Sequence, residues 1–329
     1  MRFIMPSREQ PKVFKAIKAG FDSLSSHVWL LLFPIALDLF FLFGKRLLIS
    51  NQINSFLSSF IPPEGMTADL LATWEDLKLL LSETLNNFSL TTFLRSYPIG
   101  IPSLLSNRNL SVSPLGEYST IEVNPSGTLL AVLGISAIGF LLGVIYLYAI
   151  RKSTNINPTK DSWQSFSKQL ISLIMIPLSL IVIALVIFVP ALLIISVLTA
   201  LIPLLGSIGS FLFYFMVLSA GIPLIFTAHE ILLYGTSFKD ALKESIKVVR
   251  PTNMKSSSFL FLVLFVSYIT NFLWQIPEDG SYMLLVSILG HAVVSTILWI
   301  ASFHFYEDAR NCVHRSIEEE TLDSEQLSV

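Results

Sequence analysis

The sequence predicts an all-α membrane protein, a polytopic helix bundle with six transmembrane helices and three basic amphipathic interfacial helices. Of its 329 residues 53% are hydrophobic and only 13% are charged, whereas soluble domains carry about 25% charged residues. The apolar residues form long continuous runs, and a helix needs about 20 of them to cross the hydrocarbon. These runs lack the alternating pattern of barrel strands. The net charge of −2 offers no basic field, so we expect no nucleic-acid partner.

Six apolar runs are the predicted transmembrane helices. The third run is too long for a straight span, so we expect it to tilt, kink or start in the interface. The first run has a long leader before it and no small-x-small cleavage site after it, so we interpret it as an anchor and not as a cleaved signal peptide. The predicted spans are residues 28–44, 127–150, 170–200, 210–234, 258–276 and 283–306.

The distribution of Lys and Arg predicts the orientation. If the chain has six spans, only five of its 21 Lys and Arg residues fall on one side, all within the long connection 45–126. The other 16 lie in the amino-terminal segment, two connections and the tail 307–329. The positive-inside rule therefore predicts cytoplasmic termini and an extracytoplasmic 45–126 loop in a protein of the cytoplasmic (inner) membrane. The acidic, aromatic-free tail is expected to be disordered.

A weak internal repeat precedes each odd-numbered span. Residues 12–27, 162–170 and 238–249 place apolar side chains at helical spacing with lysines between them. Such helices suit an anionic leaflet, which suggests three copies of an interfacial helix followed by a helical hairpin. Ordinary basic flanks of membrane helices are the alternative. The candidate contacts to anionic lipid are Lys12, Lys15, Lys18, Lys168, Lys239, Lys243 and Lys247.

The segment from Gly221 carries a short signature in which a proline-bearing span ends in an acidic residue and leads through a helix into the next span. Its positions here are Pro223, Glu230, Ala241, Leu242, Ser245, Val249, Arg250 and Asn253. This pattern resembles the glycerophosphodiester phosphodiesterase membrane-domain superfamily and related uncharacterised bacterial multi-pass membrane families. The resemblance covers about the last 110 residues well and the amino-terminal third loosely. It implies a six-helix membrane module without catalytic residues.

Two departures from that family pattern affect the interpretation. Pro251 and Thr252 lengthen the step between Arg250 and Asn253, and we expect Pro251 to break the helix there. His314-Arg315 is similar to the pair that opens the catalytic barrel of fused enzymes, but only 14 residues follow Arg315. A barrel needs about 250 residues, so we expect no catalytic domain in this chain.

The 45–126 loop is predicted to have two parts. Thr67 is a plausible N-cap, and apolar residues at spacings of three and four predict an amphipathic helix over about 67–93. The rest, rich in Pro, Ser and Asn, is predicted to be irregular. An insertion in one of three repeats is where specific function would reside, although it could equally be a simple lid.

Two ionisable residues fall at membrane depth, where charge is costly and therefore marks candidate sites. Asp38 lies about 15 Å into the first span at 1.5 Å per residue, and His291 lies at a similar depth in the sixth. They form a candidate midplane polar pair for a proton or ligand. Alternatively, Asp38 occupies a polar pocket, bonds a backbone group near Pro34 or is protonated, and His291 is a packing residue. Glycines at 134, 139 and 143 are interpreted as helix-packing positions.

A second group of polar residues gathers near the predicted cytoplasmic ends of the fourth and sixth spans. We interpret it as a structural ion network, because His229-Glu230 lacks the second His that a zinc helix needs four residues on. No metal or cofactor is expected, and no nucleophile elbow or phosphate loop points to an enzyme. The candidate network comprises His229, Glu230, Arg250, His304, Glu307 and Asp308.

These observations leave three classes of function open. The leading hypothesis is a non-catalytic scaffold or accessory module of the membrane, with an unidentified membrane protein partner. The alternatives are a transporter or lipid-handling protein with a midplane polar site, supported by the prolines in its spans, and an intramembrane enzyme. A polar cavity that reaches Asp38 would favour transport, whereas a filled core would favour the module.

Overall fold

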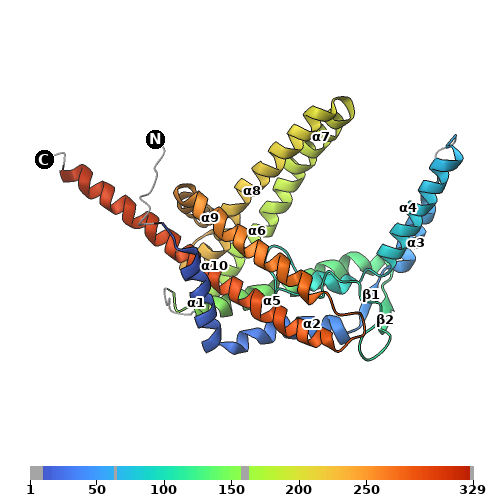
Figure 1. Cartoon of the computed structure of the whole chain (residues 1–329), viewed down its shortest axis with the longest axis horizontal. Coiled ribbons are helices and arrows are strands. Elements are labelled where there is room, and N and C mark those ends of the chain that lie inside the picture. The colour runs from blue at the N-terminus through green and yellow to red at the C-terminus, as the bar shows by residue number, and fades with distance from the viewer. Residues whose placement is uncertain (1–9, 63–64, 157–162, 327–329) are drawn as a thin grey trace. The chain divides into compact units, whose positions relative to one another are not determined.

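The computed structural model describes residues 10–62, 65–156 and 163–326, and it confirms the all-α prediction (Figure 1). Helices long and apolar enough to cross a membrane in the described residues are α5 (Pro125–Ser153), α6 with α7 (Ser165–Leu201), α8 (Pro203–Tyr234), α9 (Phe238–Trp274) and α10 (Met283–Gln326). The first predicted span, α2 (Leu32–Phe43), is too short to cross a membrane by itself and reaches the necessary length only together with the preceding helix α1 (Val13–Ser26). The chain is a multi-pass membrane protein.

Two compact units share these helices. The first unit comprises Met1–Leu30, Leu147–Ser267 and Thr296–Val329, and the second comprises Leu31–Tyr146 and Tyr268–Ser295.

In the first unit, α1 packs on α10 through its small residues. Ala16, Gly20 and Leu24 are buried, and a Cβ atom at Gly20 would lie 2.7 Å from the carbonyl oxygen of Ile297. The side chains of Phe14 and Phe21 stay exposed, 81% and 60% respectively. The first of the predicted amphipathic stretches is therefore helical, and it packs through Ala16, Gly20 and Leu24 while Phe14 and Phe21 stay exposed.

The long third span is one helical segment with a local irregularity. It consists of α6 (Trp163–Ile183), a π-helical turn η3 (Ala184–Phe188) and α7 (Val189–Leu201). Pro190, two residues after this turn, cannot donate the backbone hydrogen bond expected of an α-helical residue, which explains the wider turn. Figure 1 shows α7 beside α8, which ends at Gly235 in the left-handed conformation that favours glycine (φ 68°).

Three predictions for the first unit are wrong. The amphipathic stretches before the third and fifth spans are continuous with α6 and α9 and are not separate helices, although residue 162 lies outside the described residues. Pro251 lies inside α9 without ending it. Proline removes only the hydrogen bond to the carbonyl oxygen four residues before it, here that of Lys247, and neighbouring groups can offset that loss in a membrane helix.

The acidic tail also differs from the prediction, because α10 continues to Gln326. Extending an existing helix needs no new nucleus, and Glu and Leu are good helix formers. The spacing of Arg315 and Glu319 adds a favourable i,i+4 pair of charges.

The second unit begins at Leu31, just before α2. Its 45–126 loop is more ordered than expected. A parallel pair of strands, β1 (Arg46–Leu48) and β2 (Thr120–Glu122), brings the two ends of the loop together in the register Arg46 to Thr120. Between them lie α3 (Ser50–Ser59), α4 (Ala68–Asn86) and the 3-10 helix η2 (Leu90–Leu94), while η1 spans Val28–Leu31. Thr67 is the N-cap residue of α4, as predicted, but α4 ends at Asn86 and not near 93.

The irregular part of the loop packs against α5. Ile99, Ile101, Leu104, Leu105 and Leu110 are all buried. A Cβ atom at Gly139 would lie 2.2 Å from the Leu94 carbonyl oxygen, and one at Gly143 would lie 2.5 Å from the Cα atom of Gly100. Two of the three glycines predicted to admit a neighbouring helix therefore admit this loop, and nothing lies near Gly134.

Candidate functional site

Asp38 is completely buried in the second unit, and its carboxylate binds the loop. The Ser103 hydroxyl donates to Oδ1 at 2.5 Å, and the backbone N–H groups of Leu104 and Leu105 donate to Oδ2 and Oδ1, each at 3.0 Å. An aspartate in an apolar helix is costly unless its oxygens are hydrogen-bonded. The loop supplies three donors, so the carboxylate and the turn satisfy each other.

Arg95 holds the same turn from the opposite side. Its guanidinium donates to the Ser103 carbonyl oxygen at 2.7 Å and to the Ser106 hydroxyl at 3.2 Å. The Ser106 N–H donates to the Ser103 hydroxyl at 3.0 Å, which closes the turn. Sequence reasoning missed Arg95, Ser103 and Ser106. The Ser-x-x-Ser spacing is typical of a local hydroxyl-to-backbone turn, but nothing in it identifies Asp38 as the partner.

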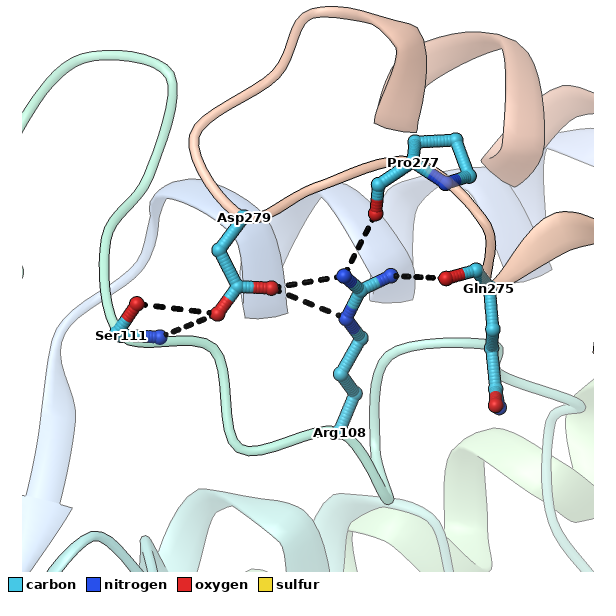
Figure 2. A network of polar contacts seen from close by, with 5 residues as sticks. All are labelled: Arg108, Ser111, Gln275, Pro277 and Asp279. Carbon is cyan, nitrogen blue, oxygen red and sulfur yellow. Dashed lines mark hydrogen bonds and ion pairs between the residues drawn. The ribbon is translucent and has the colours of Figure 1, made fainter.

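Arg108, a few residues further along the same segment of the loop, binds the turn between α9 and α10 (Figure 2). Its guanidinium contacts Asp279 Oδ1 at 2.8 Å and 3.2 Å, and it also donates to the carbonyl oxygens of Pro277 and Gln275 at 2.7 Å and 3.2 Å. The second Asp279 oxygen accepts from the N–H and hydroxyl of Ser111. Residues 103–111 of the loop are therefore held at two points by charged side chains.

The structure does not join Asp38 to His291. His291 is 5% exposed, and its Nε2 atom has no hydrogen-bond partner among the described residues. Both Asp38 oxygens are occupied by the loop. The prediction of a midplane pair assumed that two residues of similar depth face each other, and it could not anticipate that a loop segment would reach Asp38.

The first unit contains the second polar cluster, centred on Glu230. This side chain is 1% exposed and accepts from the Tyr306 hydroxyl at 2.9 Å, while Arg310 Nε lies 3.2 Å from the same carboxylate. The Arg310 guanidinium also stacks over the Tyr234 ring, 3.8 Å from its centroid. The Tyr234 hydroxyl donates to Glu307. Glu230 and Glu307 are thus linked through Arg310 and Tyr234, and Tyr306 adds a second bond to Glu230.

The other predicted members of this network lie elsewhere. His229 is buried beside Ser302, with 2.7 Å between Nε2 and the hydroxyl oxygen. His304 and Asp308 contact α1, through Ser23 Oγ at 3.2 Å and the Lys12 backbone N–H at 2.9 Å. Arg250 is exposed on α9, and no described contact joins it to the cluster.

Arg310 takes the place that the sequence assigned to Arg250. It lies four residues after Tyr306 and three after Glu307, so all three lie on one face of α10. That spacing could have suggested it. A further pair, His314 Nε2 and Glu244 Oε1 at 2.5 Å, joins α10 to α9.

The chemistry available at these two sites is that of ion pairs and hydrogen bonds. Within the described ranges, no group of three or more His, Cys, Asp or Glu residues is arranged to hold a metal ion. The lysines predicted to contact anionic lipid all lie in the first unit and are all exposed: Lys12, Lys15, Lys18, Lys168, Lys239, Lys243 and Lys247.

Comparison of the chain with protein-family models, with curated proteins and with solved structures gives no match. The similarity of the segment from Gly221 to the phosphodiesterase membrane-domain superfamily therefore stays a prediction.

Proposed function

We propose that the protein is a non-catalytic module of the cytoplasmic membrane, a scaffold or accessory protein with cytoplasmic termini. The observation that carries this proposal is the state of Asp38. A transport or catalytic carboxylate must meet a ligand, water or a proton, whereas Asp38 is fully buried and has three donors from its own chain. The group that the sequence marked as the best candidate site serves to fix the loop.

The cluster around Glu230 supports the same conclusion. Its carboxylate is 1% exposed and is neutralised by Arg310 within the first unit. Buried ion pairs of this type contribute more to a unique packing than to net stability. We infer that the cluster fixes the packing of α8 on α10.

Contact with anionic lipid is the second part of the proposal. The seven lysines predicted to contact lipid are exposed, and on α1 the exposed rings of Phe14 and Phe21 accompany them. Aromatic rings beside lysines are the combination that binds the interface of an anionic leaflet. A module held at the leaflet in this way would present its cytoplasmic segments to a partner protein.

Aqueous accessibility at position 38 tests the proposal. In a Cys312→Ser background, single cysteines at Asp38 and at Ser103, which is 2% exposed, are treated in intact membranes with a small charged thiol reagent. Cysteine at the exposed position Glu117 is the positive control. We expect labelling at 117 and none at 38 or 103. Ser103→Cys retains the Asp38 carboxylate and keeps a weak S–H donor beside it, so rapid labelling there would reveal a water path to Asp38 and would favour the transporter alternative.

A further inference from the structure

The hairpin of α3 and α4 contains an apolar groove that the loop's own packing leaves open. The groove has a volume of about 290 Å³. Its lining has one charged member and is otherwise apolar, with three aromatic rings: Phe56, Leu57, Phe60, Trp74, Leu77, Lys78, Leu81 and Leu85. Within α4 these positions recur at spacings of three and four, so one face of the helix forms the wall.

The base of this hairpin is fixed to the end of a membrane span. Gln52 donates to the Val123 carbonyl oxygen at 2.7 Å and to the Thr128 hydroxyl at 2.8 Å, at the start of α5. The Ser50 hydroxyl donates to the Asn86 carbonyl oxygen at 2.9 Å, which closes the hairpin at that point. Leu85, at the inner end of the groove, is therefore one residue from the bond that closes the hairpin, and Gln52 joins the same base to the start of α5.

The surfaces around the groove are also apolar. Ile61, Leu70 and Leu80 are 81%, 55% and 60% exposed, and no residue of α4 is buried. A protein helix laid in the groove would cover one face and leave these side chains in water. Lipid acyl chains would cover the groove and the outer faces together, so the distribution of exposed apolar area favours lipid.

The charges of the hairpin select the type of lipid headgroup. α3 has no charged residue, and α4 carries Asp69, Glu75, Asp76 and Glu83 against the single Lys78. An excess of carboxylates repels an anionic headgroup. Lys78 on the groove, with Glu75 one helical turn before it, offers a cation for a phosphate and an anion for an ammonium group.

We propose that the groove between α3 and α4 binds an acyl chain of a zwitterionic phospholipid, with Lys78 at its phosphate and Glu75 near its ammonium group. The volume accommodates roughly ten groups of about 30 Å³ each, enough for a large part of one acyl chain. This site goes beyond a scaffold function and does not depend on it.

Trp74 in the wall of the groove provides the test. The purified full chain in detergent is titrated with phosphatidylethanolamine carrying a dibrominated acyl chain, which quenches tryptophan on contact. The signal of Trp74 is the difference between the wild type and Trp74→Phe, because the chain has four other tryptophans. We expect this difference signal to be quenched saturably at a low ratio of lipid to protein.

Two variants of adjacent residues provide the matched control. Leu81→Lys places a charge in the groove, whereas Leu80→Lys adds the same charge to α4 outside its lining. Both leucines are exposed, 40% and 60%, so neither change disturbs a packed core. We expect Leu81→Lys to weaken the saturable quenching at least tenfold, because an unpaired charge is costly in an apolar site. Leu80 belongs to the outer face and not to the groove that Trp74 lines, so Leu80→Lys should leave the saturable quenching of Trp74 unchanged.

Headgroup preference completes the test. Lys78→Gln should weaken binding about two- to fivefold, the usual scale for an exposed ion pair, and brominated phosphatidylglycerol should bind less well than phosphatidylethanolamine. The proposal is overturned if quenching of Trp74 rises linearly with total lipid without saturating, if phosphatidylglycerol binds more tightly, or if the two leucine variants behave alike.

Discussion

Replacing Asp38 by alanine is expected to release the loop from α2 at a cost of about 2–6 kcal/mol. The substitution leaves the N–H groups of Leu104 and Leu105 without their acceptor in a buried site. Each buried donor without a partner costs about 1–3 kcal/mol. Asp38→Asn keeps one carbonyl oxygen and loses one acceptor, so it should cost about 1–3 kcal/mol, roughly half as much.

The measurement needs a reporter within the second unit, because the native Cys312 belongs to the first. Ala292 is fully buried in the second unit, and a cysteine differs from alanine by a single sulfur atom. In an Ala292→Cys, Cys312→Ser background, the protein in detergent is heated with a thiol-reactive dye that fluoresces on coupling. The midpoint of labelling should fall in the order parent, Asp38→Asn, Asp38→Ala.

A particular result would refute the argument. If Asp38→Ala labels at the same temperature as the parent, within the roughly 0.5 kcal/mol typical of neutral surface changes, the carboxylate does not hold the loop. If Asp38→Asn is less stable than Asp38→Ala, the main cost comes from the asparagine N–H group facing the backbone N–H groups, and not from the loss of acceptors.

Three further predictions concern other parts of the chain. Arg310→Met should destabilise the first unit by about 3–5 kcal/mol, because it leaves the Glu230 carboxylate buried and unpaired. Adding Glu230→Gln should recover part of the lost stability, which is measured by the labelling temperature of the native cysteine. If the losses from the two substitutions simply add, the two side chains are not paired. Gly143→Ala should cost about 1–3 kcal/mol, because the new Cβ atom meets loop backbone at 2.5 Å, whereas Gly134→Ala should be neutral or stabilising; equal effects would contradict the close approach. Burial raises the pKa of the Tyr118 phenol above its usual value of 10, against the opposing effect of the nearby Arg46 guanidinium. The neutral phenol is therefore favoured by folding. The contribution of the neutral phenol to the free energy of unfolding is complete below pH 10 and is lost as the pH rises through the pKa of the folded protein. In an alkaline titration, the wild type should therefore lose more stability above pH 10 than Tyr118→Phe does.

The apolar spans could be predicted from sequence because membrane insertion depends on a local property. The positions of the charge-free runs in α5, α8 and α10 follow from hydrophobicity alone. Their ends could not be predicted as well. A helix that has formed continues through any sequence that tolerates it, and for this reason α9 starts at Phe238 and α10 reaches Gln326.

The partners of the candidate residues could be predicted only where they are close in sequence. Counting residues along each span predicts that Asp38 and His291 lie at a similar depth in the membrane. Depth alone does not give the direction in which a side chain points. The true partner of Asp38 lies 65 residues away, in a segment that has no regular secondary structure. Periodicity contains no information about such a segment. Arg310, by contrast, shares a helix face with Glu307 and could have been chosen on spacing.

The parallel pairing of β1 with β2 has a consequence for how this protein can change in length. Because the two strands run in the same direction, no tight turn can join them, and the intervening chain must travel back along their length. The ends of that excursion are fixed next to α2 and α5 whatever lies between them. Loop-closure entropy grows slowly, by about 0.6 kcal/mol for each doubling of length. Helices can therefore be inserted into or removed from this excursion with little effect on the register of the spans that flank it.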